Sequence, residues 1–242
     1  MLSRNEVKYI QSLGHKKNRD EEGCFVAEGV KVVGELIQTG FTIKKIYAIK
    51  NWIETNKYLT NITEVEETEL KRISNFETPN KVVAIVEKKK LSPIPNLKNK
   101  LTLVLDGIQD PGNLGTIMRT ADWFGIENII ASGDTADVFN AKVVQSTMGS
   151  IARVNIFYTD IEAFLSENKI AVYGAMLNGE NISTIKKINE ALVLIGNEGK
   201  GIRENLKPFV EKKILIPGIG NAESLNAAVA TGIILYSLRF NA

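Results

Sequence analysis

The chain has 242 residues, with 30 Lys and Arg against 28 Asp and Glu, and 44% of its residues are hydrophobic. At roughly 100–200 residues per domain, this is one large domain or two small ones with a buried core, which excludes disordered and fibrous proteins. The single cysteine, Cys24, excludes an internal disulfide. The single histidine, His15, excludes a zinc cluster and a Ser-His-Asp triad.

The apolar stretches of the chain are short. None approaches the roughly 20 residues that a bilayer span needs. The first eight residues carry Arg4, Glu6 and Lys8 without the apolar core of a secretory signal. We therefore expect a cytoplasmic protein without a membrane segment.

Positive charge is slightly concentrated in the first part of the chain. Residues 1–95 hold 16 Lys and Arg against 13 Asp and Glu, whereas residues 96–242 hold 14 against 15. The excess is small, but it indicates where an anionic partner would bind.

A change of composition divides the chain. Lys88–Lys90 run into Pro93 and Pro95, which cannot continue a helix or a central strand. We expect a domain boundary here, between residues 1–93 and 94–242; an ordinary solvated loop within one domain is the alternative.

The first part reads as a small α/β domain. Ser3 and Glu6 have capping-box spacing and predict a helix that buries Val7, Ile10 and Leu13. Apolar residues at helical spacing predict a second helix over residues 28–39, and alternation predicts strands. The further expected elements are strands at 43–49 and 82–86 and short helices at 52–59 and 67–73.

The second part has a different pattern, in which continuous apolar runs alternate with helical segments. Such runs are typical of strands buried on both faces of a parallel sheet. The expected strands are residues 101–105, 126–131, 154–158, 170–175, 191–195 and 213–216. We therefore predict an α/β fold with a mostly parallel sheet.

Three of these strands lead into loops rich in Gly and Asn, at residues 106–115, 196–201 and 217–226. Ligands of open α/β sheets bind outside the carboxyl ends of the strands, so the loops predict one shared crevice. They do not match nucleotide-binding fingerprints. Gly199-Lys200 is followed by glycine and lacks the Walker A pattern, and neither loop with G-x-G spacing has the third glycine of a dinucleotide site.

The loops do match a family pattern. Asp110-Pro-x-Asn113-x-Gly115-x-x-x-Arg119-Thr-Ala121, then Gly196-Asn-Glu198-Gly-x-Gly201, then Ile216-Pro through Glu223-Ser224-Leu225-Asn226 closely resemble the three motifs of SpoU/TrmH RNA 2′-O-ribose methyltransferases of the SPOUT superfamily. Leu13-x-x-Lys16-Lys17-x-Arg19 and Phe25-Val-Ala-Glu28-Gly29 are similar, more loosely, to the substrate-binding domain of many members.

The resemblance implies a SPOUT-like C-terminal trefoil knot, S-adenosyl-L-methionine as cofactor, no metal and a homodimer. It implies that main-chain groups and apolar contacts hold the adenosine. The implied cofactor residues are Gly196, Gly201, Ile216 and Leu225, with Met176 and Leu177 from a neighbouring strand end; core packing is the alternative for each.

The implied catalytic residues are Arg119, Asn113, Glu198, Ser224 and Asn226. Methyl transfer from a sulfonium needs the ribose hydroxyl held in line and helped to lose its proton. An arginine is a poor base, so Arg119 is expected to bind the RNA phosphate and stabilise the developing alkoxide; the alternative is an ordinary surface arginine.

The resemblance also implies that the N-terminal domain binds RNA. The residues expected to neutralise phosphates are Arg4, Lys8, Lys16, Lys17 and Arg19. The substrate is expected to be structured RNA, ribosomal rather than transfer RNA. Two alternatives stay open, a non-catalytic RNA-binding or ribosome-assembly protein that keeps the fold and a nucleotide-using oxidoreductase.

Overall fold

The computed structural model describes residues 2–89 and 93–241 and divides into two compact units. Unit 1 consists of Met1–Lys90 and Asp137–Ala152, and unit 2 of Leu91–Ala136 and Arg153–Ala242. The boundary expected after residue 93 lies beside residues 90–92, which lie outside the described residues. No sequence pattern predicted that residues 137–152 belong to unit 1.

Unit 1 contains a four-stranded sheet in the order β1-β4-β2-β3. Strand β4 is antiparallel to β1 and β2, and β3 is parallel to β2. The strands are β1 (Cys24–Glu28), β2 (Ile43–Ala48), β3 (Ile62–Glu64) and β4 (Val82–Glu87). The expectations for β2 and β4 are confirmed, whereas β1 and β3 were not predicted.

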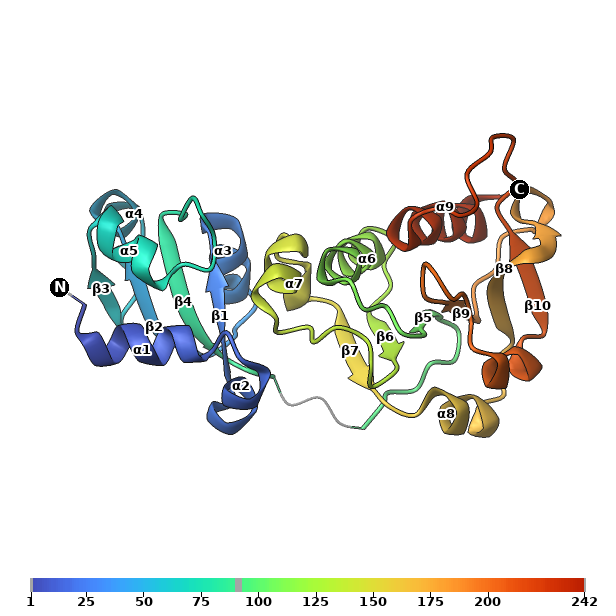
Figure 1. Ribbon diagram of the computed structural model, residues 1–242, viewed down its shortest axis with the longest axis horizontal. Coiled ribbons are helices and arrows are strands. Elements are labelled where there is room, and N and C mark those ends of the chain that lie inside the picture. Colours follow the sequence, from blue (N-terminus) through green and yellow to red (C-terminus); the bar gives the residue numbers. More distant parts are fainter. Residues whose placement is uncertain (1, 90–92, 242) are drawn as a thin grey trace. The chain divides into compact units, whose positions relative to one another are not determined.

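Helices accompany this sheet (Figure 1). They are α1 (Arg4–Ser12), α2 (Lys16–Glu22), α3 (Val30–Gln38), α4 (Lys50–Thr55), α5 (Glu67–Ile73), α7 (Ala141–Ser146) and the 3₁₀ turn η1 (Ser150–Ala152). The expected helix at 67–73 is confirmed, and that at 52–59 lies at Lys50–Thr55 instead.

The start of α1 confirms the capping box. The Ser3 hydroxyl accepts the backbone N–H of Glu6 at 3.2 Å, and the Glu6 carboxylate accepts the backbone N–H of Ser3 at 3.0 Å. Both interactions satisfy N–H groups that a helix start leaves without partners. Val7, Ile10 and Leu13 are buried in the unit 1 core, as their spacing predicted.

The helix expected over residues 28–39 begins two residues later, because Glu28 ends the buried strand β1. The Glu28 carboxylate is 3% exposed and accepts hydrogen bonds from the Ser74 hydroxyl, at 2.6 Å, and from the backbone and side chain of Asn75, at 2.8 and 2.9 Å. A buried carboxylate requires such donors, so Glu28 attaches β1 to the segment after α5.

Unit 2 contains a six-stranded sheet in the order β10-β8-β9-β5-β6-β7, in which every pair is parallel (Figure 1). Its strands are β5 (Leu101–Leu105), β6 (Asn128–Ala131), β7 (Asn155–Tyr158), β8 (Val172–Asn181), β9 (Ala191–Ile195) and β10 (Lys212–Leu215). The central strands β5 and β9 are buried at every residue. The predicted parallel sheet is confirmed.

Helices α6 and α9 pack against each other in unit 2 (Figure 1). The helical elements of this unit are α6 (Pro111–Trp123), α8 (Ile161–Glu167), α9 (Ala227–Phe240) and the 3₁₀ turns η2 (Ile182–Thr184) and η3 (Glu204–Phe209). None of the helices in the described residues is long and apolar enough to cross a bilayer.

Strand β8 is longer than expected, and its pairing with β10 is interrupted by a shift in register, which we call the bulge of β8. Lys213 pairs with Gly174, but the next residue, Ile214, pairs with Glu180. A Cβ atom on Gly179 would lie 2.6 Å from backbone atoms of Ile214, so β8 and β10 approach too closely there for a side chain. Residues 175–179 lie between the two paired stretches and have no register partner on β10.

Candidate active site

The strand register brings the three motif loops of unit 2 to one edge of its sheet. Leu105 pairs with Ile195, Leu194 with Gly174, and Gly174 with Lys213. Because these strands are parallel, the segments that follow them leave the sheet at the same side. The predicted crevice at the carboxyl ends of β5, β9 and β10 is consistent with this register.

Three polar side chains, one from each motif, are linked at this edge by two hydrogen bonds, with Asn113 in the middle. The Asn113 amide nitrogen donates to Glu198 Oε2 at 3.0 Å, and the Asn226 amide nitrogen donates to Asn113 Oδ1 at 2.8 Å. Asn113 thus meets two residues that lie 85 and 113 positions later in the chain, and we call these three residues the polar triplet.

Helix starts hold two members of the triplet. Asp110 caps α6 and accepts the backbone N–H of Asn113 at 2.7 Å. Asn226 caps α9, where its Oδ1 accepts the backbone N–H groups of Ala228 and Val229 at 3.0 and 3.3 Å. Because Asn226 Oδ1 is occupied by these donors, its amide nitrogen faces Asn113, which in turn directs the Asn113 nitrogen to the Glu198 carboxylate.

Arg119 lies further along α6 and is exposed. Its guanidinium makes no hydrogen bond or ion pair with any other described residue. At about 100° per residue, its side chain leaves the helix roughly 120° away from that of Asn113. The structure therefore does not join Arg119 to the polar triplet, and it leaves the guanidinium open to an anion.

Ser224 is also outside the triplet. It lies in the exposed segment 217–225 between β10 and α9, which extends away from the body of unit 2 (Figure 1). Two apolar side chains of this segment are uncovered, Ile219 fully and Leu225 at 45%. An apolar residue of a loop that remains open to solvent is available for contact with a ligand.

The expected cofactor residues lie at or beside the same edge. A Cβ atom on Gly196 would lie 2.3 to 2.5 Å from backbone atoms of Gly201 and Ile202, so only glycine fits there. Gly201 has a left-handed φ of +68° and exchanges backbone hydrogen bonds of 2.8 and 3.1 Å with Asn197. The loop 196–201 is thus a tight backbone turn.

The apolar candidates differ in exposure. Ile216, just after β10, is half-buried. The bulge of β8 carries Met176, which packs partly on the core, and Leu177, which is 79% exposed. Leu177 is therefore the member of this pair that is free to contact a ligand.

Further polar residues at this edge were not among those expected from the sequence. Asp106 directly follows β5 and is 1% exposed; its carboxylate accepts the backbone N–H of Arg203 at 2.8 Å and Arg203 Nε at 2.5 Å. The hydrogen bond to Asp106 raises the pKa of the Arg203 guanidinium. The signal that could have found Asp106 is an acidic residue directly at the end of a wholly apolar strand.

Asp134 is a second acidic partner of Arg203, at 3.5 Å from its guanidinium. A hydrogen bond from Ser132 lowers the pKa of the Asp134 carboxyl, and the charge of Arg203 lowers it further. The Ser132 hydroxyl also accepts the backbone N–H of Gly107 at 2.9 Å, so the ends of β5 and β6 are joined here.

The residues expected to bind RNA differ in exposure. Arg4, Lys8, Lys16 and Lys17 are exposed, with Lys17 in a loose pair with Glu21 at 3.9 Å. Arg19 is only 3% exposed. Its guanidinium donates to the carbonyl oxygens of Leu13 and Gly14, at 2.9 and 2.8 Å, and to Asp137 Oδ2 at 2.6 Å. Its donors are thus used inside unit 1, which gives Arg19 a structural position rather than an exposed one.

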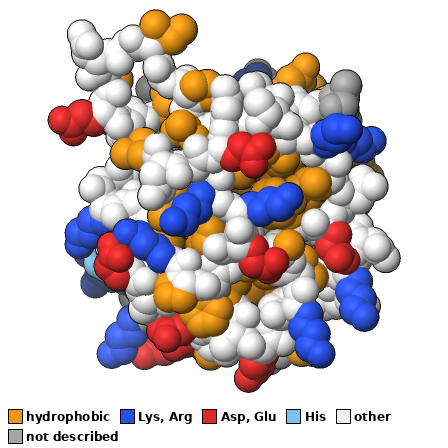
Figure 2. Space-filling view, turned by 90° about the vertical axis from the view of Figure 1, so that its right-hand side faces the viewer, with side chains coloured by type: hydrophobic (Ala, Val, Ile, Leu, Met, Phe, Trp, Pro, Cys, Tyr) orange, Lys and Arg blue, Asp and Glu red, His pale blue; other side chains and the backbone are white. Residues whose placement is uncertain are grey.

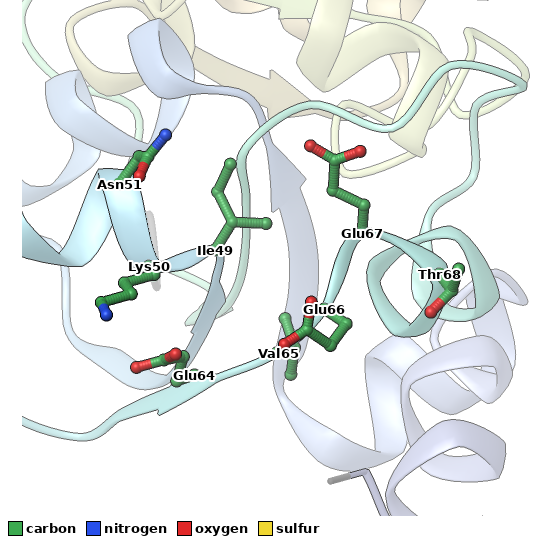
Figure 3. Close-up of a pocket in the computed structure, with 8 residues that line it drawn as sticks. All are labelled: Ile49, Lys50, Asn51, Glu64, Val65, Glu66, Glu67 and Thr68. Carbon is green, nitrogen blue, oxygen red and sulfur yellow. The ribbon is translucent and has the colours of Figure 1, made fainter.

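Unit 1 also contains a pocket of about 380 Å³ between the starts of α4 and α5 (Figure 3). Its lining includes Glu64, Glu66 and Glu67 and none of the expected site residues. Carboxylates repel phosphate, so this pocket does not suit an RNA backbone. Within the described part of the chain, no group of His, Cys, Asp and Glu is placed so that it could hold a metal ion.

The face of unit 2 in Figure 2 carries Lys and Arg interspersed with Asp and Glu, with apolar side chains between them. No stripe of one sign appears on this face. The view matches the nearly balanced charge of residues 96–242.

A parallel sheet with a polar triplet and a glycine turn at its carboxyl edge defines a ligand-binding α/β protein. The family comparison names the class: residues 100–236 match the model of the SpoU rRNA methylase family, and residues 4–84 match that of the MRM3-like substrate binding domain. The chain belongs to the SpoU rRNA methylase family.

Its relatives extend over both units. The chain is 31% identical over 245 aligned residues to the 23S rRNA (guanosine(2553)-2′-O)-methyltransferase RlmP of Bacillus subtilis, covering 97% of this chain and 96% of the relative. The structure of an AdoMet-bound rRNA methyltransferase from Sinorhizobium meliloti superposes with a TM-score of 0.87 at 34% identity, covering 98% and 95% of the two chains. The SpoU methyltransferase AviRb from Streptomyces viridochromogenes, in complex with AdoMet, superposes with a TM-score of 0.84 at 26% identity, covering 98% and 97%.

Proposed function

We propose that this protein transfers a methyl group from S-adenosylmethionine to the 2′-hydroxyl of a ribose in ribosomal RNA. The observation that carries the proposal is the polar triplet, in which Asn113 of the first motif donates to Glu198 of the second and accepts from Asn226 of the third. The relatives named above, which are rRNA methyltransferases or carry AdoMet, support the same activity.

The carboxyl edge of the sheet has features that suit the cofactor. The turn at Gly196 presents backbone without side chains, and Leu177 and Leu225 are apolar and uncovered. These residues, with Ile216 and Gly201, would hold the adenosine through main-chain groups and apolar contact. When bound, S-adenosylmethionine supplies a methyl group on a sulfonium, which is a good leaving group.

The residues of the chain would then position the ribose and stabilise its charge. The triplet offers amide donors and a carboxylate acceptor that can orient a hydroxyl at near-attack distance, and Ser224, two residues before Asn226 in the chain, would add a hydroxyl. An arginine is a poor base, so we assign Arg119 to the RNA phosphate and to the developing alkoxide rather than to proton removal. Its free guanidinium supports this role.

The proposal is tested with the full-length protein, 23S rRNA and radiolabelled S-adenosylmethionine. We expect Arg119→Ala to lower methyl transfer by about 100-fold or more, as removal of one charge-stabilising donor does elsewhere, with unchanged cofactor binding in calorimetry. Arg153→Ala, which removes an arginine paired with Asp122 on the same unit, is the control.

Wild-type protein that transfers no methyl group to any rRNA would contradict the proposal and favour a non-catalytic RNA-binding protein. Transfer to tRNA instead would correct the substrate. Near-wild-type turnover of Arg119→Ala would remove that residue from the site.

We infer that residues 1–93 form the RNA-holding domain and that residues 94–242 form the catalytic one. The match of residues 4–84 to a substrate-binding domain model supports this division. We assign the contacts with RNA phosphates to four exposed cations, Arg4, Lys8, Lys16 and Lys17. Because Arg19 is buried, we assign to it a structural role in the unit that carries these cations.

We also infer a homodimer that forms through α6 and α9. These two packed helices expose an apolar set that a second copy would cover: Trp123 at 85%, Val229 at 52%, Ile233 at 37%, Tyr236 at 60% and Phe240 at 64%. So many large apolar side chains on adjoining helices indicate an interface. A monomeric mass in sedimentation at micromolar concentration would contradict the dimer.

Two further features follow from the same family assignment. We infer that the chain forms the trefoil knot, which is supported by the close crossing of β8 and β10 at Gly179 and by the position of β10 at the sheet edge beyond β8. An experimental density map that traced α9 without passage through a loop would contradict it. We also infer action in the cytoplasm, where cell fractionation should find the protein with ribosomal RNA.

A further inference from the structure

Three residues connect the loop after β9 to the loop after β5, and we call them the loop anchor: Asp106, Asn197 and Arg203. Asp106 accepts both the backbone and the side chain of Arg203. The Asn197 amide nitrogen donates to the carbonyl oxygen of Gly107 at 2.7 Å. The anchor thus joins the two loops on both sides of the glycine turn.

The Asp106 carboxylate cannot be left without its partner. It is 1% exposed, and an unpaired charge at that depth is strongly unfavourable. Arg203 meets it with two donors, its backbone N–H on one carboxylate oxygen and its side-chain Nε on the other, which fixes direction as well as distance. The Arg203 side chain is 48% exposed, so Asp106 is the buried partner of this ion pair.

The Asn197 side chain forms hydrogen bonds within the turn 196–201. Its Oδ1 accepts the backbone N–H groups of Gly199 and Lys200, at 3.0 and 3.2 Å, while its nitrogen is used by Gly107. Every polar atom of this side chain therefore has a partner across or within the loop. These hydrogen bonds of the Asn197 side chain stabilise the turn between Gly196 and Gly201.

Glu198 lies between the two attachment points. It follows Asn197 directly, and Arg203 closes the loop five residues later. Its Oε2 is the acceptor for the Asn113 amide nitrogen at 3.0 Å. Glu198 is exposed and makes no second hydrogen bond or ion pair among the residues that the structure describes, so its place against Asn113 depends on the backbone that carries it.

We propose that Asp106 and Arg203 are positioning residues that set Glu198 against Asn113 by attaching the glycine turn to the end of β5. The proposal rests on the methyl-transfer function proposed above. Arg203 itself does not contact the substrate or the cofactor in this proposal. Arg203 affects methyl transfer only through the position of Glu198.

The first test uses nuclear magnetic resonance of the full-length protein and needs no activity. We expect Glu198→Ala to shift the side-chain amide resonance of Asn113, and Arg203→Met to shift the same resonance in the same direction. Arg203→Lys, which keeps the charge and one donor, should restore it in part. Arg153→Met is the matched control, since it breaks an arginine–carboxylate pair outside both loops. An unchanged Asn113 resonance in Arg203→Met would overturn the proposal.

The second test is a double-mutant cycle on methyl transfer to 23S rRNA. We expect Arg203→Met to lower kcat about tenfold in the wild-type background and less than about threefold when Glu198 is already alanine. The second loss is smaller because Glu198→Ala has already removed the side chain that Arg203 positions. The KM for the cofactor should change less than kcat. Equal losses of kcat in both backgrounds would overturn the proposal. A wild-type protein without transfer activity would contradict the proposed function alone, and the resonance of Asn113 would still decide the role of Arg203.

Discussion

Gly196 is the single residue at which one added methyl group has the sharpest expected effect. In Gly196→Ala, the new Cβ atom would lie 2.3 to 2.5 Å from the backbone of Gly201 and Ile202, so the turn must open. At the ~1–3 kcal/mol typical of overpacking, we expect affinity for S-adenosylmethionine to fall about tenfold.

The control is Gly199→Ala in the same loop. Its added Cβ atom would meet only Asn197 Oδ1, at 3.7 Å, which is ordinary contact. Calorimetry with S-adenosylhomocysteine should find nearly wild-type affinity for it. Equal losses in the two variants would show that the close approach at Gly196 does not shape the cofactor site.

The element α2 depends on one buried ion pair that reaches a distant part of the sequence. Arg19 of α2 binds Asp137, which lies 118 residues later in the segment that leads to α7. Arg19→Met would leave the Asp137 carboxylate and the carbonyl oxygens of Leu13 and Gly14 without this donor. We expect the free energy of unfolding to fall by about 3 kcal/mol, the lower end for breaking a buried pair.

Lys17→Met is the control on the same helix. Lys17 is exposed and only loosely paired with Glu21, so its loss should cost less than about 0.5 kcal/mol. Urea unfolding of both variants makes the comparison. If Arg19→Met were as stable as Lys17→Met, the ion pair to Asp137 would not support unit 1.

For the whole molecule, the small excess of positive charge in residues 1–95 predicts salt-dependent RNA binding. A variant with Gln at Arg4, Lys8, Lys16 and Lys17 should lower the slope of log K against log salt concentration by about 3, because up to four phosphate contacts are lost. Filter binding of 23S rRNA from 50 to 200 mM salt measures the slope.

The matched control replaces four exposed lysines of unit 2, Lys98, Lys169, Lys186 and Lys187, by Gln. An equal change in slope for both variants would show that the cations of unit 1 have no special role. Substitution is a cleaner test than removal of residues 1–93, because residues 137–152 belong to unit 1 and would lose their packing partners.

The sequence by itself determined most of the elements and the family. The capping box at Ser3 and the apolar runs of β5 and β9 are local patterns, and local propensity and burial suffice to predict them. The motif loops also predicted Asn113, Glu198 and Asn226 as site residues, because their residue types and spacing resemble the family motifs. That prediction concerned which residues belong to the site, not how they touch.

The tertiary structure decided what depends on contacts between distant segments. The strand order that joins β10 to β8, the buried pair of Arg19 with Asp137 and the loop anchor at Asp106 are such contacts. An arginine in the sequence looks the same whether its charge meets RNA or a buried carboxylate. Only the folded chain shows which partner lies within hydrogen-bond distance, because burial and pairing are properties of the packed structure.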